Sequence, residues 1–462
     1  MMTFEGWIHN RIRQAFDGDE EFRCATGKAG LVEVTRQDIE TYQLLKLNRI
    51  IAYARANSSL YRERLDGVDE IGSLEELSRV PFTSASDLEK SPYRLLCVSI
   101  SGIARVFSHF TTGTMTGRPK KIFFTEKDAD RIVDSMAALM ESVFSSIGLD
   151  AAGRTVHIFL PNNGPPMSMA ALISRGVEYL GGTPAIGDCT APTSQQIQSI
   201  KEARPDMLMG SAFRIWRITQ EARESYNLSQ MGVRAVFITS EYLSKSMRRR
   251  IEEYWQAEVF HHYGMTEPGF AIGVECGAHS GFHFNETYLF FEVVDPVTGQ
   301  VLEDGEEGEL VLTTLQREGM PLIRYRTGDV ASLLGGRCEC GASTLTRIGY
   351  LPKRLGLIVD LKGGEQIYTA MLDEALYRVP ELIDYRVFVF EEGDRDILLC
   401  KVETLANDSE VETAVQNELM ALPSIYRSME SGDIDMPRVE FVERGMLRRG
   451  GRRMKRRIVD RR

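Results

Sequence analysis

Short apolar runs alternate with longer segments of helical periodicity between residues 154 and 263, and this alternation limits the possible folds more than any other feature of the chain. The run RTVHIFL at 154–160 precedes the helical segment MSMAALISRGVEYL, and later runs follow helical segments in the same way. Strands that alternate with helices of about 10–15 residues predict βαβ units and a largely parallel sheet. Ligands of such sheets bind beyond the carboxyl ends of the strands, which places residues 238–244 and 261–269 near a candidate site.

The pattern changes after residue 284. The segment LFFEVVDPVTGQVLEDGEEGELVLTTL alternates apolar and polar residues around turn signals, which predicts antiparallel strands. From Lys353 onward, helix, hairpin, helix and strand patterns follow one another. We therefore expect an α/β protein with two domains: a large multi-subdomain N-terminal domain at residues 1–352, with mostly parallel sheets plus a β segment, and a small mobile α+β C-terminal domain at residues 353–462.

Charge and hydropathy restrict the partners and the location. The chain carries a net charge of −11 and contains no run of eighteen apolar residues and no apolar segment near its start, so we expect a cytoplasmic protein without a membrane partner. The tail at 445–462 is strongly basic, and one interpretation is a nucleic-acid-binding arm. The acidic body and the absence of aromatic residues among the tail's cations argue against nucleic acid as a partner.

Four separate polar stretches need a common explanation. TTGTMTGRPKK at 111–121 offers hydroxyls, backbone N–H groups and cations, which suit phosphate oxygens, although its spacing is not that of P-loop ATPases. YGMTE at 263–267 follows a predicted strand, RYRTGDV at 324–330 carries a carboxylate, and KRLG at 353–356 offers cations. Each stretch alone is also compatible with an ordinary surface turn.

Together, and in this order, the four stretches resemble the adenylate-forming superfamily of acyl- and aryl-CoA ligases, and within it the phenylacetate–CoA ligase group. The resemblance covers almost the whole chain and is strongest in DPVTGQVLEDGEEGELVLTTLQREGMPLIRYRTGDVASLL. It implies ATP-dependent, AMP-forming activation of a carboxylic acid. The nucleotide-binding residues that it implies are Thr111, Thr112, Gly113, Thr114, Thr116, Gly117 and Lys120 at the β- and γ-phosphates, Ser240, Glu241 and Tyr263 at the adenine, Gly264 and Met265 beside them, and Asp329 and Arg354 at the ribose.

The resemblance also implies the catalytic residues. Thr266 and Glu267 would contribute to the α-phosphate and to a Mg²⁺ ion, with Glu267 as the ligand of the metal. A lysine of the small domain supports adenylation in this superfamily, and Lys455 is the candidate here; the alternative is a tail that has changed its role.

Three positions depart from the family pattern. Gly113 and Gly117 are separated by three residues rather than two, so the contacts of the individual threonines with phosphate are open. Gly356 occupies a hinge position where an acidic residue is common. The tail has Arg452 where the family pattern places the lysine after its glycine.

Cysteine and histidine residues suggest a second site. Cys276 combines with His283, or alternatively with His279, and CEC supplies Cys338 and Cys340, which together could form a tetrahedral, structural Zn²⁺ site. The alternative interpretations are free thiols in exposed turns and, for His283, a place in the acyl pocket, because the family carries Gly-x-His there.

The expected function is therefore an acid–thiol ligase that adenylates an aromatic or other small carboxylic acid and transfers the acyl group to coenzyme A. The alternatives are delivery to a carrier-protein thiol or to an amine, and a non-catalytic nucleotide-binding descendant. A homodimer is usual in the group that the chain resembles, and we expect one here.

Overall fold

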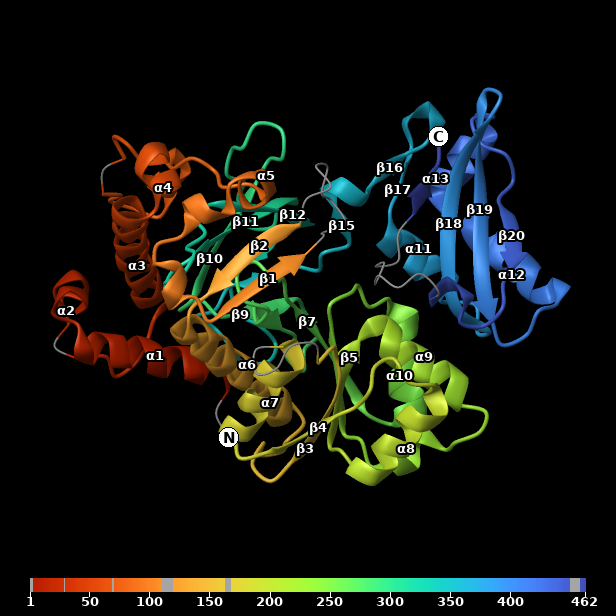
Figure 1. Ribbon diagram of the computed structural model, residues 1–462, viewed down its shortest axis with the longest axis horizontal. Helices are drawn as coiled ribbons and strands as arrows, with labels where there is room; N and C mark the ends of the chain where they lie inside the picture. Colours follow the sequence, from red (N-terminus) through yellow and green to blue (C-terminus); the bar gives the residue numbers. More distant parts are fainter. Residues whose placement is uncertain (1–2, 29, 69, 110–118, 163–167, 449–457) are drawn as a thin grey trace. The chain divides into compact units, whose positions relative to one another are not determined.

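The computed structural model describes residues 3–28, 30–68, 70–109, 119–162, 168–448 and 458–462 (Figure 1). The chain divides into two compact units. The first unit comprises Met1–Val156, Pro161–Ala185 and Phe260–Tyr350, and the second comprises His157–Leu160, Ile186–Val259 and Leu351–Arg462.

The helices of the first unit begin at polar capping residues. Thr35 and Thr125 each form a capping box with the aspartate three positions later, which satisfies backbone N–H groups at the helix start. Gly176 permits close packing of two of these helices, since a Cβ there would lie 3.1 Å from Cε of Met140. These helices are α1 (Phe4–Gly18), α2 (Glu20–Thr26), α3 (Arg36–Asn57), α4 (Ser59–Arg64), α5 (Ala85–Lys90), α6 (Glu126–Ser146) and α7 (Met169–Tyr179).

Antiparallel strands carry much of the first unit. One hairpin pairs β1 (Arg105–His109) with β2 (Lys120–Phe124), and a second group has the order β10 (Leu289–Val294), β11 (Gly308–Thr314), β12 (Tyr325–Ala331). The prediction of antiparallel strands after residue 284 is confirmed. The last group has the order β7 (Glu258–Tyr263), β8 (Gly273–Val274), β9 (Phe282–Phe284), β14 (Arg347–Ile348), β13 (Leu333–Leu334).

The second unit contains the predicted βα alternation. β5 (Met207–Ser211) pairs in parallel with β6 (Ala235–Thr239), and each strand is followed by a helix, which confirms a parallel α/β arrangement in this part of the chain. The helices are α8 (Thr193–Ala203), α9 (Ala212–Ala222) and α10 (Lys245–Trp255). Two further strands of the predicted alternation, β3 (Thr155–Phe159) and β4 (Thr183–Ile186), each have residues in both units.

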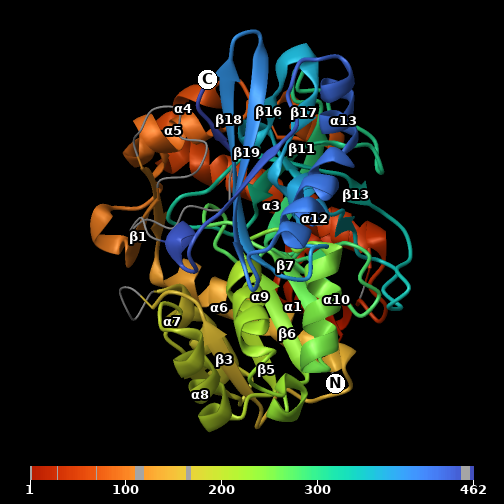
Figure 2. The ribbon, with the colours of Figure 1, turned by 90° about the vertical axis from the view of Figure 1, so that its right-hand side faces the viewer.

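The C-terminal part of the second unit has the predicted α+β composition. Its long hairpin, with α12 and α13 beside it, is visible in Figure 2, and the strand order is β20-β19-β18-β21. The elements are β15 (Lys353–Arg354), β16 (Val359–Asp360), β17 (Gln366–Ile367), α11 (Thr369–Leu376), β18 (Leu382–Glu392), β19 (Arg395–Thr404), α12 (Ser409–Met420), α13 (Pro423–Glu430), β20 (Arg438–Phe441) and β21 (Val459–Asp460).

A single apolar core runs through the second unit. Trp216 of α9 packs edge-on against Tyr377 at a centroid distance of 5.2 Å, so residues on either side of position 350 share one core. Beside it, the buried guanidinium of Arg217 forms an ion pair with Glu403 of β19. This shared core explains why residues 351–462 cluster with residues 186–259. A domain boundary at residues 352 and 353 stays a prediction.

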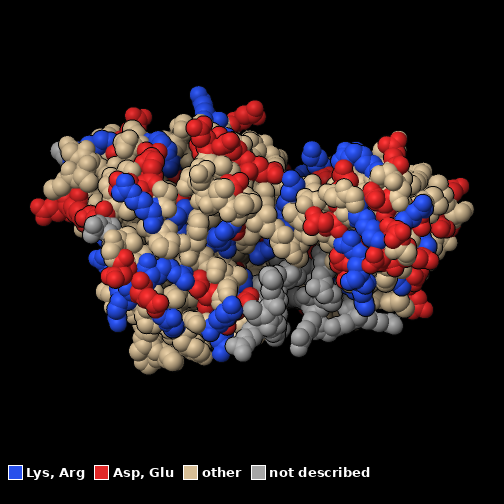
Figure 3. Space-filling view, turned by 90° about the horizontal axis from the view of Figure 1, so that it is seen from above, with Lys and Arg blue, Asp and Glu red and all other residues tan. Residues whose placement is uncertain are grey.

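Surface charge and helix hydropathy bear on the expectations about nucleic-acid and membrane partners. On the face seen in Figure 3, acidic and basic side chains of the described residues are interspersed. Within the described ranges, no helix combines the length and the apolar character needed to span a bilayer.

Candidate functional site

Polar side chains of the first unit gather where β7 ends and the segment 263–267 begins. The hydroxyl of Tyr263 donates a hydrogen bond to Oδ2 of Asp329 in β12, at 2.8 Å. The backbone N–H of Asp329 donates to Oγ1 of Thr327 at 3.0 Å, so the backbone and the side chain of Asp329 are each held by a hydrogen bond. Gly264 is required between them, because a Cβ at this position would lie 2.2 Å from the carbonyl oxygen of Phe270. Tyr263 and Asp329, which are both predicted to contact the nucleotide, are therefore in direct contact with each other.

Glu267 lies in the same segment, inside a buried polar network. Nζ of Lys120 in β2 lies 2.9 Å from Oε1 of Glu267 and donates to the hydroxyl of Tyr325 at 3.1 Å. The Tyr325 hydroxyl donates in turn to the same Oε1 at 3.2 Å. All three side chains are buried. Lys120, predicted to contact phosphate, thus holds the carboxylate predicted to bind Mg²⁺.

Arg317 holds the backbone of this segment. One of its terminal nitrogens donates to the carbonyl oxygen of Glu267, and the other donates to the carbonyl oxygen of Phe123 at 2.9 Å. Its guanidinium lies 4.2 Å from the centroid of the Phe124 ring, and burial lowers the pKa of Arg317 to about 10. Arg317 therefore connects β2 to the Glu267 segment. The sequence interpretation did not single out Arg317 or Tyr325, although Tyr325 lies within the quoted RYRTGDV segment.

The remaining residues of the segment lie close to these contacts. Sδ of Met265 lies 3.8 Å from the Tyr263 hydroxyl, and its side chain is buried. Thr266 accepts, through its backbone carbonyl, the N–H of Gly269 at 3.2 Å, which closes a tight turn after β7.

Other predicted site residues lie in the second unit. Ser240 follows β6 with φ of +78°, a left-handed conformation that turns the chain at the strand end. Oε2 of Glu241 accepts the backbone N–H of Phe213 at 2.9 Å, which fixes the start of α9. Arg354 ends the short strand β15. Their contact with adenine or ribose stays a prediction.

Two groups of predicted residues fall outside the described part of the chain. They are the candidate adenylation lysine, Lys455, and the phosphate-loop residues Thr111, Thr112, Gly113, Thr114, Thr116 and Gly117.

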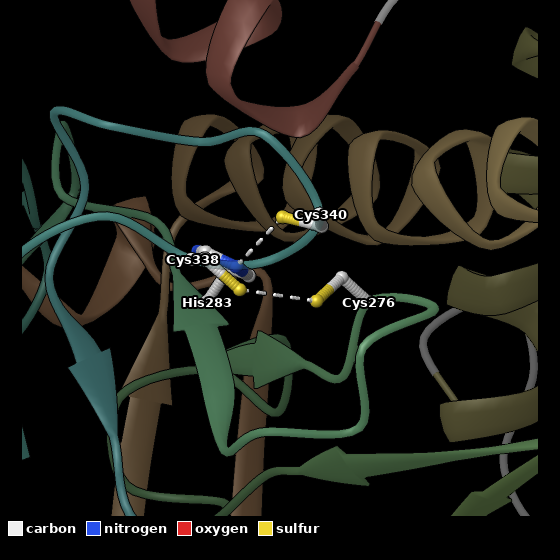
Figure 4. A group of neighbouring side chains, drawn as sticks. All are labelled: Cys276, His283, Cys338 and Cys340. Carbon is white, nitrogen blue, oxygen red and sulfur yellow. Dashed lines mark hydrogen bonds between the residues drawn. The ribbon is translucent and has the colours of Figure 1, made fainter.

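The predicted metal ligands Cys276, His283, Cys338 and Cys340 lie together in the first unit (Figure 4). Their ligand atoms all lie within 4.8 Å of one another. The two Sγ atoms of Cys276 and Cys338 are 3.7 Å apart, and Sγ of Cys340 is 3.5 Å from Nε2 of His283. His279, the alternative ligand, instead places Nδ1 3.4 Å from Glu275. The structure therefore brings His283 to the three cysteines.

The loop that carries Cys338 and Cys340 is tied to the N-terminal helices. Thr344 shares a hydrogen bond of 2.7 Å between its Oγ1 and Nε2 of His9, and its N–H donates to Glu5 of α1 at 2.7 Å. The carbonyl oxygen of Thr344 accepts from Arg36 of α3 at 3.1 Å. These hydrogen bonds connect the cysteine loop to α1 and α3.

Comparison with known protein families and sequences finds relatives of the chain. Residues 104–316 match the family model described as "AMP-binding enzyme". The chain is 30% identical over 389 residues to a phenylacetate-coenzyme A ligase of Thermus thermophilus, covering 81% of this chain and 83% of that protein. It is also 30% identical over 381 residues to a phenylacetate-coenzyme A ligase of Aromatoleum evansii, covering 80% and 83%.

Solved structures place the fold in the same class. A 2-hydroxyisobutyryl-CoA ligase in the postadenylation state, in complex with 2-HIB-AMP, aligns with a TM-score of 0.76 at 22% identity, covering 92% of this chain and 90% of that one. This is the fold of an adenylate-forming ligase. By sequence, the chain belongs to the phenylacetate–coenzyme A ligase group of the adenylate-forming family.

Proposed function

We propose that the protein is an ATP-dependent, AMP-forming acid–thiol ligase that acts on an arylacetic or similar small carboxylic acid. The acid's carboxylate attacks the α-phosphorus of ATP, which forms an acyl-adenylate and releases pyrophosphate. The thiol of coenzyme A then attacks the acyl carbon, which forms the thioester and releases AMP. The membership of the chain in the phenylacetate–coenzyme A ligase group carries this proposal, and the relatives' printed substrate makes phenylacetate the first acid to test.

Side chains of the first unit have defined tasks in this reaction. Asp329, held by Tyr263, accepts hydrogen bonds from the ribose hydroxyls. Glu267, held by Lys120 and Tyr325, would be the ligand of Mg²⁺, for which a carboxylate oxygen is a suitable donor. The bound ion would neutralise charge on the phosphate oxygens. Lys455 would donate to the oxygen atoms of the reacting phosphate.

Carboxylate-dependent exchange of ATP with labelled pyrophosphate tests the adenylation step. We expect exchange with one class of acid from a panel of aryl, heteroaryl and short aliphatic acids, and we expect Asp329→Asn to abolish it. Asp295→Asn is the matched control, because Asp295 accepts only local hydrogen bonds in an exposed turn. Binding of ATP without exchange for any acid would refute a ligase and favour a nucleotide-binding descendant.

The acceptor is tested by product analysis. Coenzyme A, glycine, lysine and a carrier protein bearing a phosphopantetheine thiol are added in turn to the active acid and ATP. A coenzyme A thioester detected by mass spectrometry, with AMP in equal amount, supports the proposal. Amide formation without the thioester would instead indicate an amide-forming ligase. One relative, named indoleacetate–lysine synthetase, is 25% identical to the chain over 234 residues.

We also propose that Cys276, His283, Cys338 and Cys340 bind a structural Zn²⁺ ion. Tetrahedral zinc, with bonds of about 2.3 Å to sulfur and about 2.0 Å to nitrogen, separates two sulfurs by roughly 3.8 Å and a sulfur from a nitrogen by roughly 3.5 Å. The separations of 3.7 Å between the Cys276 and Cys338 sulfurs and 3.5 Å between Cys340 and His283 fit this geometry. Four protein ligands leave no position for substrate, so the ion's role is structural.

Metal analysis of protein purified under reducing conditions tests this site. We expect about one zinc per chain, and we expect Cys338→Ser to lose it. Cys97→Ser is the control, since Cys97 is buried in the same unit but lies outside the cluster. A metal-free protein with three titratable thiols in the cluster would refute the zinc site and leave Cys276, Cys338 and Cys340 as reduced cysteines.

A further inference from the structure

We propose that Tyr325 is a positioning residue that orients the carboxylate of Glu267 for the metal-bound nucleotide. This inference rests on the proposed function and adds a residue to it. The observation behind it is the closed set of contacts among Lys120, Glu267 and Tyr325, in which each side chain touches the other two.

The position of Tyr325 is set by the strand that carries it. Tyr325 is the first residue of β12, where it pairs with Leu312 of β11, and its backbone forms a bridge with Thr83. Its side chain is fully buried. The ring therefore has little freedom to move, and its hydroxyl is presented to Glu267 from a rigid element.

Two donors meet on one carboxylate oxygen. Oε1 of Glu267 accepts from the Lys120 ammonium at 2.9 Å and from the Tyr325 hydroxyl at 3.2 Å. Lysine alone fixes little, because its ammonium rotates on a flexible stem. The ammonium also donates to the Tyr325 hydroxyl at 3.1 Å, so the tyrosine fixes the cation as well as the anion.

The backbone of Glu267 is fixed independently. Arg317 donates to the carbonyl oxygen of Glu267 and to that of Phe123, and its guanidinium stacks on Phe124. With the backbone held in this way, the remaining freedom of Glu267 is in its side-chain torsions. Lys120 and Tyr325 restrict those torsions.

A carboxylate that binds a metal depends on such support. Hydrogen-bond partners of a metal ligand fix its orientation, and their loss typically lowers metal affinity by about 10–100-fold. In Tyr325→Phe, the ring still fills its place in the core while Glu267 and Lys120 each lose one partner. Metal-dependent binding should weaken, whereas metal-free binding of ATP should not.

The experiment compares Tyr325→Phe with Tyr385→Phe. Tyr385 is also buried, but it lies in the second unit, and its hydroxyl donates to Oδ1 of Asp373 at 2.6 Å, so the control variant likewise removes a buried hydrogen bond between a phenol and a carboxylate. Two quantities are measured for each protein: the Mg²⁺ concentration that gives half-maximal pyrophosphate exchange, and the affinity for ATP by calorimetry with Mg²⁺ and with EDTA. Thermal melting records any loss of stability.

For Tyr325→Phe, we expect the half-maximal Mg²⁺ concentration to rise roughly tenfold and ATP affinity to fall only when Mg²⁺ is present. For Tyr385→Phe, we expect both quantities to stay within about twofold of the unmodified protein at a similar loss of melting temperature. An unchanged Mg²⁺ dependence in Tyr325→Phe, or a loss of ATP affinity that is equal in EDTA, overturns the inference.

Failure of the proposed function is distinguishable from failure of this inference. If the unmodified protein catalyses no exchange with any acid, the ligase activity is refuted, and the calorimetric comparison alone decides the role of Tyr325. If Mg²⁺ does not strengthen ATP binding to the unmodified protein, the inference is overturned as well.

Discussion

Tyr263 and Asp329, which are 66 residues apart in the chain, are joined by a hydrogen bond of 2.8 Å between the phenol hydroxyl and a carboxylate oxygen. Tyr263 ends β7 and Asp329 lies in β12, so the bond connects two groups of strands in the first unit. It links a residue expected at the adenine to a residue expected at the ribose.

Removing this hydroxyl should weaken ATP binding. In Tyr263→Phe, we expect the KM for ATP to rise about tenfold, because Asp329 loses a hydrogen bond to a charged group, for which about 1.5 kcal/mol is typical. Steady-state kinetics with varied ATP measures this. Tyr288→Phe is the matched control, since its hydroxyl donates to Asp134 at 2.7 Å elsewhere in the same unit. Equal effects of the two substitutions would contradict a nucleotide-specific role for Tyr263.

Removing one partner of the buried ion pair between Arg217 and Glu403 should destabilise the second unit. Arg217 is 1% exposed and Glu403 is fully buried. In Glu403→Gln, the guanidinium keeps Glu221 and Asp384 beside it but loses a third carboxylate, so we expect a loss of about 1–3 kcal/mol in the free energy of unfolding. Urea unfolding measures this.

The exposed pair of Glu365 and Arg427 provides the control for this substitution. Glu365→Gln should leave the urea midpoint nearly unchanged, because water solvates both groups after the change. A similar midpoint for Glu403→Gln and Glu365→Gln would show that the buried pair contributes no more than a surface pair.

Removal of the proposed zinc ion should loosen the N-terminal helices as well as the cysteine loop. Thr344 connects that loop to His9 of α1 and to Arg36 of α3. After chelation, we expect faster amide hydrogen exchange in residues 338–346 and in α1, measured by mass spectrometry. Exchange in β18 and β19 of the second unit is the internal reference. Unchanged exchange in α1 would show that Thr344 does not transmit the loss.

His157 should make the protein less stable in mild acid. Its ring is buried, stacks on Phe159 at 4.4 Å and has Nε2 3.2 Å from Oγ of Ser199. Burial lowers the pKa of His157 to about 4 from an ordinary value of 6.5. Between these two pH values the unfolded chain binds the proton and the folded chain does not, so stability falls as pH is lowered, by up to about 1.4 kcal/mol per pH unit.

The contribution of His157 is isolated by substitution. His157→Gln should show a shallower dependence of the unfolding free energy on pH between 6.5 and 4 than the unmodified protein. His262, whose pKa burial lowers to about 3, stays in both proteins and so cancels in the difference. Parallel curves for the two proteins would rule out His157 as the titrating group.

The sequence predicted the features that depend on local pattern. Apolar runs between helical segments predicted the β5–α9–β6–α10 order, and the turn signals near 295–308 predicted the antiparallel pairing of β10 with β11. Cys276, His283, Cys338 and Cys340 were recognisable as one group because their residue types are rare and suit a single metal. His279 was the alternative ligand, since spacing alone does not say which ring faces the thiols.

The tertiary structure alone decided the contacts between distant residues. Lys120 was assigned to phosphate from its place after a Thr-Gly loop, yet its ammonium lies against Glu267, 147 positions later. Tyr325 and Arg317 carried no functional signal of their own, because a tyrosine at the start of a strand and an arginine between two strands are ordinary residues. Local sequence determines periodicity, turns and ligand types through short-range sterics and polarity. The contacts among the buried Lys120, Glu267 and Tyr325 are fixed only when separate strands pack together and exclude water.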